Sequence, residues 1–252
     1  MEITILTIFP EMFVSPFSES IIKRAIEKKI IEINVVDIRN FTRDKHRSVD
    51  DYSYGGGPGM VLKPEPIIEA IKDIEKSNDG PKNKIIITSA QGKVFNQDSA
   101  RNLANYKKII FVCGRYEGID ERVFKLLDAE EISIGDYVMT GGEIATMVMV
   151  DVIARMIPGV LGKEESMKND SFYHGLLDYP HYTRPESYRR YKVPKVLLSG
   201  NHHEIEKWRI KQSLLRTMIR RPDLLANKKY SKEELEILME LEADYQEKEG
   251  EK

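Results

Sequence analysis

The sequence predicts an α/β fold: a parallel-sheet domain followed by a small, mainly helical second domain. The first 160 residues alternate short runs of isoleucine and valine with helical patterns. A glycine-rich, polar stretch then interrupts this alternation, and two amphipathic helical patterns follow it. We therefore expect an α/β domain over residues 1–160, a linker over residues 161–180 and a helical domain over residues 181–252.

Five runs rich in isoleucine and valine are the expected strands of the first domain. They cover residues 3–8, 31–36, 84–88, 109–113 and 131–134. Continuous apolar runs of this kind are typical of strands that are covered on both faces of a parallel sheet. The expected helices cover residues 11–28, 65–75, 97–105, 120–128 and 142–156. This spacing of strands and helices predicts that the sheet is parallel.

The region after the first domain changes in composition. It contains several glycines and the polar run KEESMKNDS, without helical or strand periodicity, which is typical of a linker. Beyond the prolines that follow, apolar periodicity predicts helices over residues 201–220 and 231–247. The second of these helices opens with Ser231 and Glu234 at the spacing of a capping box.

The composition is that of a globular protein without a secretion or membrane signal. Of the 252 residues, 41% are hydrophobic and 32% are charged, and a single cysteine cannot form an intrachain disulfide. The N-terminus lacks the basic segment of a signal peptide, and no apolar run reaches the length that spans a bilayer. We expect a cytoplasmic protein that makes no contact with membranes.

Positive charge is concentrated in one part of a chain whose net charge is −2. Residues 184–221 contain eleven Lys and Arg residues against three acidic residues, whereas residues 222–252 contain five against ten. A local basic block indicates an anionic partner, and nucleic acid is the commonest such partner. A solvated helical face of ordinary charge content would explain the block equally well.

Three glycine-containing segments follow successive expected strands, at the edge where open α/β sheets bind ligands. They are SAQGK at residues 89–93, CGRYEGID at 113–120 and IGDYVMTGGE at 134–143. None of them fits the GxGxxG motif of dinucleotide-binding domains or the GxxxxGK[ST] motif of phosphate loops. One cysteine and five scattered histidines give no zinc-type spacing. The segments therefore predict a nucleotide-like ligand that is held by backbone groups, because glycine lets the backbone approach a ligand closely.

Longer motifs, in a fixed order along the chain, resemble those of a known family. YGGGPGM, CGRYEGIDERV, SIGDYVMTGGE, IPGVLG, DSFYHGLLDYPHYTRPE and LLSGNHHEIEKWRIKQSL are similar to segments of the bacterial tRNA (guanine-37-N1) methyltransferases, members of the trefoil-knotted (SPOUT) methyltransferase superfamily. The resemblance covers roughly residues 1–225. It implies a deep trefoil knot in the C-terminal part of the α/β domain, and a homodimer with the active site at the subunit interface. Knots are rare in proteins, so this expectation rests on the resemblance alone.

The resemblance also implies which residues bind the methyl donor, S-adenosyl-L-methionine. The loops of the knot would hold this cofactor in a bent shape, with backbone groups at the adenine edge and apolar side chains against the adenine faces. By motif, the cofactor-binding residues are Ser89, Gln91, Gly92, Gly114, Tyr116, Ile134, Gly135, Asp136, Tyr137, Val138, Met139, Gly141 and Gly142.

Methylation of guanine N1 needs a general base, because N1 carries a proton that must leave, and it needs a cation or donors for the charge that develops on O6. The resemblance implies that Asp170 is this base and that Arg155 is its electrostatic partner. From the residues alone, Asp170 would be a helix cap or a solvated loop residue, and Arg155 a cation favoured by the helix dipole. Glu117 is a candidate contact for Mg²⁺, or alternatively a loop cap.

The implied substrate is the anticodon stem-loop of tRNA, methylated at N1 of guanosine 37, on the 3′ side of the anticodon. Basic residues of the second domain would then neutralise its phosphates; they are Arg184, Arg189, Arg190, Lys207, Arg209, Lys211, Arg216 and Arg220. Two alternatives stay open. One is a knotted RNA methyltransferase that acts on the ribose 2′-O, and the other is a non-catalytic RNA-binding protein that keeps the knot as a scaffold.

Overall fold

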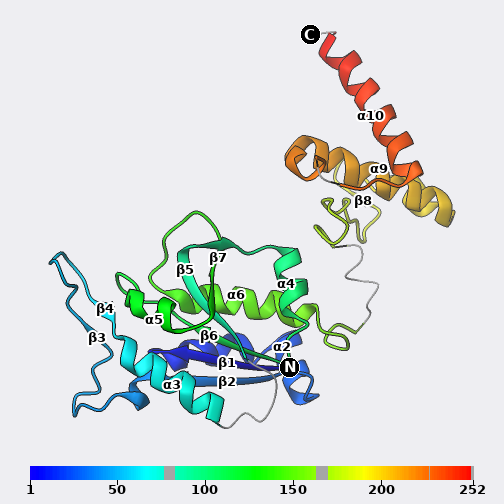
Figure 1. Cartoon of the computed structure of the whole chain (residues 1–252). Helices are drawn as coiled ribbons and strands as arrows, with labels where there is room; N and C mark the ends of the chain where they lie inside the picture. Colours follow the sequence, from blue (N-terminus) through cyan, green and yellow to red (C-terminus); the bar gives the residue numbers. More distant parts are fainter. Residues whose placement is uncertain (77–82, 163–169, 227, 251–252) are drawn as a thin grey trace. The chain divides into compact units, whose positions relative to one another are not determined.

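The computed structural model describes residues 1–76, 83–162, 170–226 and 228–250 of the chain. The chain divides into two compact units, Met1–Gly162 and Lys163–Lys252. The first unit contains the sheet and its covering helices, and the second contains two long helices and a short hairpin (Figure 1).

The first unit is built on a five-stranded sheet with the strand order β2-β1-β6-β5-β7, in which every pair of neighbours is parallel. Its strands are β1 (Glu2–Thr7), β2 (Glu32–Asp37), β5 (Lys84–Val94), β6 (Lys108–Val112) and β7 (Ala129–Ser133). The five predicted strands and their parallel arrangement are confirmed. Because β6, β5 and β7 are parallel neighbours, their carboxyl ends lie at the same edge of the sheet.

Helices cover both faces of this sheet (Figure 1). On one face, the core contains residues of α2 (Ser20–Glu27), α4 (Gln97–Leu103) and α6 (Gly142–Arg155). On the other face, it contains residues of α3 (Pro64–Lys76) and α5 (Glu121–Leu126). Successive strand residues alternate between the two cores: Ile109 and Phe111 belong to the first core, Ile110 and Val112 to the second. This explains why the strands read as uninterrupted apolar runs.

The single helix predicted over residues 11–28 is wrong, because the segment forms three short pieces. They are a 3₁₀ turn η1 (Pro10–Phe13), α1 (Val14–Phe17) and α2. Ser20, the first residue of α2, has a φ of +53°, a conformation that cannot continue a right-handed helix. The break lets Phe13 and Phe17 both enter the core, where their rings lie 5.7 Å apart.

The strand predicted over residues 84–88 continues further, so the expected loop SAQGK is part of β5. Thr88 and Lys93 both pair with Ile132 of β7, which makes the residues between them a bulge. A side chain at Gly92 would come within 2.5 Å of the Ile132 backbone nitrogen. The glycine therefore lets the bulged strand stay against β7.

Between β2 and α3 the chain forms a short 3₁₀ turn, η2 (Ile38–Phe41), and an antiparallel arm of β3 (Asp50–Asp51) and β4 (Val61–Leu62). The motif YGGGPGM lies in this arm, which projects from the body of the first unit (Figure 1). The arm was not among the predicted strands.

The second unit contains the hairpin strands β8 (Ser187–Tyr188) and β9 (Tyr191–Lys192), then α8 (Lys195–Leu198), α9 (His202–Arg220), the 3₁₀ turn η3 (Pro222–Leu224) and α10 (Lys232–Gly250). Its core joins Leu214 of α9 to Ile237 and Leu241 of α10, with Leu176 from the segment before the hairpin. Both long helices were predicted. The predicted capping box at the start of α10 is confirmed, with the Ser231 nitrogen 2.8 Å from a Glu234 carboxylate oxygen and the Glu234 nitrogen 3.2 Å from Ser231 Oγ.

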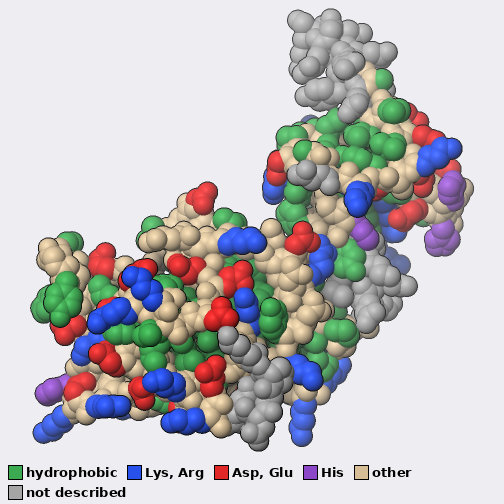
Figure 2. Space-filling model, viewed as in Figure 1, with side chains coloured by type: hydrophobic (Ala, Val, Ile, Leu, Met, Phe, Trp, Pro, Cys, Tyr) green, Lys and Arg blue, Asp and Glu red, His purple; other side chains and the backbone are tan. Residues whose placement is uncertain are grey.

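Within the described ranges, no helix has both the length and the apolar character needed to cross a membrane. Acidic and basic side chains are interspersed over the face of the first unit that Figure 2 shows, without a large patch of one sign.

Candidate functional site

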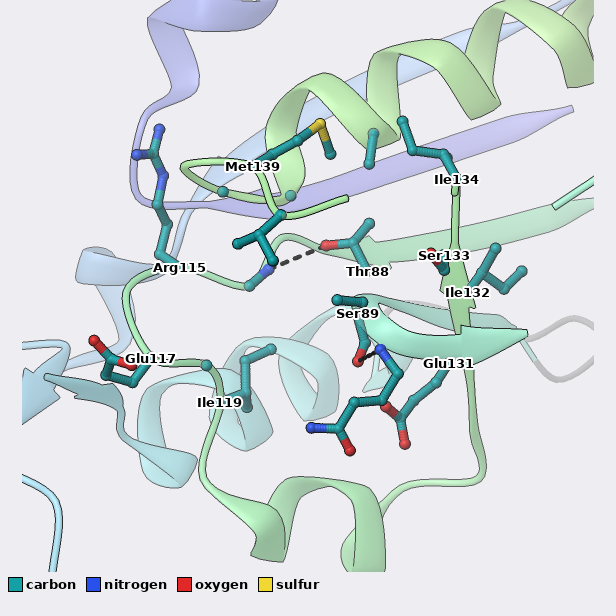
Figure 3. A pocket seen from close by; sticks show the side chains of 18 of the residues that line it. Thr88, Ser89, Arg115, Glu117, Ile119, Glu131, Ile132, Ser133, Ile134 and Met139 are labelled. Carbon is teal, nitrogen blue, oxygen red and sulfur yellow. Dashed lines mark hydrogen bonds between the residues drawn. The ribbon is translucent and has the colours of Figure 1, made fainter. Parts of the chain in front are cut away.

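A cavity of about 360 Å³ lies in the first unit, at the bulge of β5 and at the ends of β6 and β7. Its walls come from three segments: the bulge of β5, the loop between β6 and α5, and the loop between β7 and α6 (Figure 3). This is the edge of a parallel sheet at which ligands bind in open α/β folds, and the volume is within the range of small-molecule sites.

Eleven of the thirteen residues expected to bind the cofactor line this cavity. They are Ser89, Gln91, Gly114, Tyr116, Ile134, Gly135, Tyr137, Val138, Met139, Gly141 and Gly142. Gly92 is not among the lining residues, because it packs against the backbone of Glu131 and Ile132. Asp136 is also absent from the lining. Gly92 and Asp136 therefore belong to the motifs but do not line the cavity.

The three wall segments are joined through a close approach of backbone at Gly142. Its nitrogen donates to the Gly114 carbonyl oxygen at 2.8 Å, and the Gly114 nitrogen donates to Thr88 Oγ1 at 3.2 Å (Figure 3). The Thr88 hydroxyl in turn donates to the Val112 carbonyl oxygen at 3.2 Å. A Cβ atom at Gly142 would overlap Thr88 Oγ1 and come within 3.0 Å of the Gly114 nitrogen. Only glycine fits at this junction, so close packing explains the glycine at position 142.

A buried ion pair lies beside the cavity and was missed by the sequence analysis. Arg115 Nε donates to Glu143 Oε2 at 3.0 Å, and the Glu143 side chain is 1% exposed. The other carboxylate oxygen of Glu143 accepts a hydrogen bond from the Thr7 hydroxyl at 2.9 Å. The Arg115 guanidinium also donates to the Thr140 carbonyl oxygen at 3.1 Å and lies 4.5 Å from the centre of the Phe9 ring. Arg115 therefore joins the loop after β6 to the loop before α6 and to the end of β1.

A sequence pattern could have indicated this pair. Arg115 follows Gly114 and Glu143 follows Gly142, so residues of opposite charge occupy matching positions after two glycines whose backbones touch. The loops are tied once more by a backbone bridge between Arg115 and Gly141.

The loop before α6 offers both backbone groups and apolar surface to the cavity. Gly135 has a φ of +150°, and the Tyr137 hydroxyl donates back to the Ile134 carbonyl oxygen at 3.2 Å. Val138 is 91% exposed although it lines the cavity, so an apolar side chain is available to a ligand there. Ile134 and Met139 are half-buried and pack against the core on the side of α6 (Figure 3).

Tyr116 occupies a strained position on the wall formed by the loop after β6. Its φ is +58°, which is uncommon for a residue with a side chain. Partial burial, together with the Asp50 carboxylate of the β3–β4 arm, raises the pKa of Tyr116 above its usual value. The phenol therefore stays a neutral hydrogen-bonding group at physiological pH.

Glu117 lines the cavity and packs against the glycine-rich arm. Its backbone nitrogen donates to the Met60 carbonyl oxygen at 3.1 Å, and its side chain fills the space in which a Cβ of Gly59 would lie. Among the described residues, no group of three or more His, Cys, Asp and Glu side chains is placed to hold a metal ion. Glu117 is thus a single acidic residue at the cavity, between two loops.

The two residues expected to perform the chemistry belong to different units. Arg155 is the last residue of α6 and is half-buried. Asp170 is exposed in the second unit, and its carbonyl oxygen accepts a hydrogen bond from the Tyr173 nitrogen at 3.2 Å. Neither residue lines the cavity of the first unit. Their expected pairing stays a prediction.

Part of the basic block of the second unit is neutralised by nearby acidic residues. Arg209 lies 3.4 Å from Glu206 on α9, and Lys211 lies 3.6 Å from Glu240 on α10. The acidic segment after residue 221 therefore offsets some of the positive charge that precedes it.

Comparison with known proteins matches these features to one family. The family described as tRNA (Guanine-1)-methyltransferase TrmD matches residues 1–227. A tRNA (guanine-N(1)-)-methyltransferase of Desulforamulus reducens is 53% identical over 96% of this chain and 95% of its own length. Proteins of the same name from Syntrophomonas wolfei and Dictyoglomus turgidum are 56% and 50% identical, over 96% and 98% of this chain and 97% and 99% of their own lengths. The chain belongs to the tRNA (Guanine-1)-methyltransferase TrmD family.

Proposed function

We propose that this chain transfers the methyl group of S-adenosyl-L-methionine to N1 of guanosine 37 in tRNA, in the cytoplasm. The observation that carries the proposal is the cavity at the bulge of β5 and the ends of β6 and β7, whose walls lie within the residues that match the family. Relatives over 50% identical across nearly the whole chain carry the name of this activity, which supports N1 of guanine as the acceptor atom.

The cavity supports S-adenosyl-L-methionine as the ligand. Backbone groups of Gly114, Gly135 and Gly141 border it, and they can read the edge of an adenine ring without the phosphate-binding geometry that this sequence lacks. Val138 and Met139 offer apolar contacts to the ring faces. The hydrogen bond from Gly142 to Gly114 and the bridge from Arg115 to Gly141 tie the loop after β6 to the loop before α6. We propose the deep trefoil knot because the chain belongs to a family that it resembles in these loops.

In the proposed chemistry, the cavity binds the methyl donor and residues outside the cavity transfer the proton. Attack on a sulfonium methyl is an in-line displacement, so the cavity contributes mainly by positioning the methyl donor. Asp170 would accept the N1 proton, and Arg155 would stabilise the negative charge that develops on O6. An exposed Asp on the segment after the α/β unit can meet an RNA substrate that is too large to enter the cavity.

We propose that the active chain is a homodimer with the active site at the subunit interface. Ile144 and Val148 lie four residues apart on α6 and are 48% and 42% exposed, so one face of a core helix presents apolar side chains to solvent. Val14 on α1 is also exposed. Sedimentation at micromolar concentration should give twice the chain mass of 29.1 kDa, and a stable monomer would contradict the proposal.

Glu117 is the proposed contact for Mg²⁺. A single carboxylate is a weak Mg²⁺ site, because this ion usually completes its octahedron with water and substrate oxygens. The ion would therefore be held only together with RNA. Glu117→Gln should weaken the dependence of the methylation rate on Mg²⁺ while leaving binding of the methyl donor in place.

Residues 181–252 are the proposed tRNA-binding domain, and residues 161–180 are the proposed linker that carries Asp170, although most of this linker belongs to the second unit. The basic residues between Arg184 and Arg220 would release counterions from the anticodon stem-loop, so affinity should fall steeply as salt rises.

A transfer assay with mapping of the product tests the proposal. Radiolabelled S-adenosyl-L-methionine and a tRNA transcript with guanosine at position 37 should give label on N1 of that base, identified by mass spectrometry. Asp170→Ala should lower turnover by about 100-fold or more, the usual contribution of a general base. Label on a ribose 2′-O would favour the other knotted enzyme class. Binding of the methyl donor without any transfer would favour a non-catalytic RNA-binding protein.

A further inference from the structure

The β8–β9 hairpin of the second unit carries two tyrosines and two arginines that have no structural role in the core. Tyr188 and Tyr191 are 64% and 67% exposed, and every residue from 187 to 192 is exposed. Pairing between the two strands defines the hairpin. Ser187 pairs with Lys192, Tyr188 pairs with Tyr191, and the Val193 nitrogen donates to the Glu186 carbonyl oxygen at 2.9 Å.

The pairing of the two tyrosines places both rings on one face. Residues directly opposite each other in an antiparallel pair project to the same side, with Cβ atoms about 5 Å apart. Every residue of the hairpin is exposed, so neither ring is buried in a core. The two rings form a surface on which planar groups can stack.

The tip of the hairpin adds positive charge to this surface. The Arg189 guanidinium carbon lies 5.6 Å from the centre of the Tyr188 ring, and that of Arg190 lies 5.3 Å from the centre of the Tyr191 ring. Arg190 also donates to the Tyr191 hydroxyl at 3.2 Å. Each arginine is therefore held beside a tyrosine. Within the described part of the chain, neither arginine forms an ion pair with an acidic side chain.

Arg189 holds its place at a conformational cost. Its φ is +56°, where hairpin tips normally carry Asn or Gly. A residue with a long side chain is disfavoured there, and such strain often marks a functional site. By contrast, Arg209 and Lys211 of α9 lie beside acidic residues. The hairpin thus presents two cations that, among the residues the structure describes, form no ion pair with an acidic side chain, next to aromatic rings.

We propose that the β8–β9 hairpin binds unpaired nucleotides of the tRNA anticodon loop, with Tyr188 and Tyr191 stacking on bases and Arg189 and Arg190 contacting the adjoining phosphates. This inference rests on the proposed function for the identity of the RNA. Single-stranded nucleic acid is recognised by exposed aromatic rings beside positive charge, whereas a paired stem offers phosphates but no free base faces. A protein partner would require a larger apolar area than two tyrosines provide.

Binding of two RNAs to the full chain tests the inference. One is an anticodon stem-loop, and the other is a duplex of the same length with no unpaired nucleotides; affinity is measured by fluorescence anisotropy at fixed salt. The double variant Tyr188→Ala/Tyr191→Ala should raise the Kd for the stem-loop about tenfold or more, and change the Kd for the duplex less than about twofold. Tyr188→Phe/Tyr191→Phe keeps the rings and should restore stem-loop binding.

The arginines should act differently from the tyrosines. Arg189→Ala/Arg190→Ala should weaken binding of both RNAs and reduce the slope of log affinity against log salt by about two. Lys232→Ala is the matched charge control, because Lys232 is 93% exposed on α10, and it should leave both affinities unchanged.

Two outcomes would overturn the inference. One is a stem-loop Kd that does not change in Tyr188→Ala/Tyr191→Ala, and the other is an equal loss for stem-loop and duplex. Methyl transfer by the unaltered chain is measured separately. If the unaltered chain methylates guanosine 37 but the hairpin variants keep their affinity for the stem-loop, only the role of the hairpin is refuted. If the hairpin variants lose affinity for the stem-loop but the unaltered chain transfers no methyl group, only the proposed function is refuted.

Discussion

Replacing Arg115 by methionine should destabilise the first unit strongly, because it leaves the Glu143 carboxylate buried without its cation. Glu143 is 1% exposed and would keep only its hydrogen bond from the Thr7 hydroxyl among the contacts described above. Removing one partner of a buried pair typically costs about 3–5 kcal/mol of unfolding free energy. The hydrogen bond from Arg115 to Thr140 is lost as well, which adds about 1 kcal/mol. Methionine keeps much of the apolar contact that the arginine stem makes.

Urea unfolding of the full chain, followed by circular dichroism, measures this effect. For a slope of about 3 kcal/mol per molar urea, the midpoint of the sheet-containing unit should fall by about 1–2 M. Glu143→Gln alone should cost less than Arg115→Met, because Arg115 is 16% exposed and its charge can still be hydrated.

The double variant Arg115→Met/Glu143→Gln separates the ion pair from other effects. With both charges removed, no uncompensated charge is buried, so the double variant should be more stable than Arg115→Met alone. Binding of S-adenosyl-L-methionine should weaken in both Arg115 variants, since the guanidinium holds the Thr140 carbonyl, which lies between the lining residues Met139 and Gly141. An unchanged urea midpoint for Arg115→Met, or strictly additive costs of the two single variants, would refute the role assigned to this pair.

Three further predictions concern other parts of the chain. Gly142→Ala should lower affinity for the methyl donor by about tenfold or more in calorimetry, because the added Cβ overlaps Thr88 and separates the wall segments. Cys113 should react with a thiol reagent at pH 8 only after unfolding, because burial raises the pKa of its thiol far above that pH. Ser231→Ala should destabilise α10 by about 1 kcal/mol in thermal unfolding, since it removes the hydroxyl that accepts a hydrogen bond from the Glu234 nitrogen.

Each of these predictions has a contradicting outcome and a control. Gly162→Ala is the control for the first, since no atom lies within 4 Å of an added Cβ there, and equal affinities of the two variants would contradict the wall-junction role of Gly142. Rapid labelling of Cys113 in the native protein would contradict its burial. Unchanged stability of Ser231→Ala would mean that the capping box contributes nothing in this helix.

The sheet could be predicted from the sequence because its strands are buried on both faces. Runs such as Ile109 to Val112 can satisfy two cores at once only in a covered parallel sheet. The extension of β5 could not be predicted in this way. It depends on pairing across to Ile132 of β7, and the glycine, alanine and lysine of SAQGK are poor strand formers by themselves. The break at Ser20 likewise depends on where Phe13 and Phe17 pack.

The candidate site was predictable in outline, because the glycine segments directly follow strands whose ends meet at one edge. Its closest packing was not. Gly142 touches Gly114 and Thr88 only because β6 lies next to β5 in the sheet. The order of strands in a sheet cannot be predicted from local sequence. The matching positions of Arg115 and Glu143, 28 residues apart, become informative only once the preceding glycines are known to touch. Both residues lie within the long motifs, and the fold supplies the reason for them.

We propose that the cavity binds the methyl donor and that Asp170 acts only in proton transfer. Calorimetric titration with S-adenosyl-L-methionine tests this separation of roles. The unaltered chain and Asp170→Ala should bind the methyl donor with Kd values within about threefold of each other, while Gly142→Ala binds at least about tenfold more weakly. Loss of binding in Asp170→Ala, together with full binding in Gly142→Ala, would contradict the account, because the methyl donor would then lie outside the cavity after β5, β6 and β7.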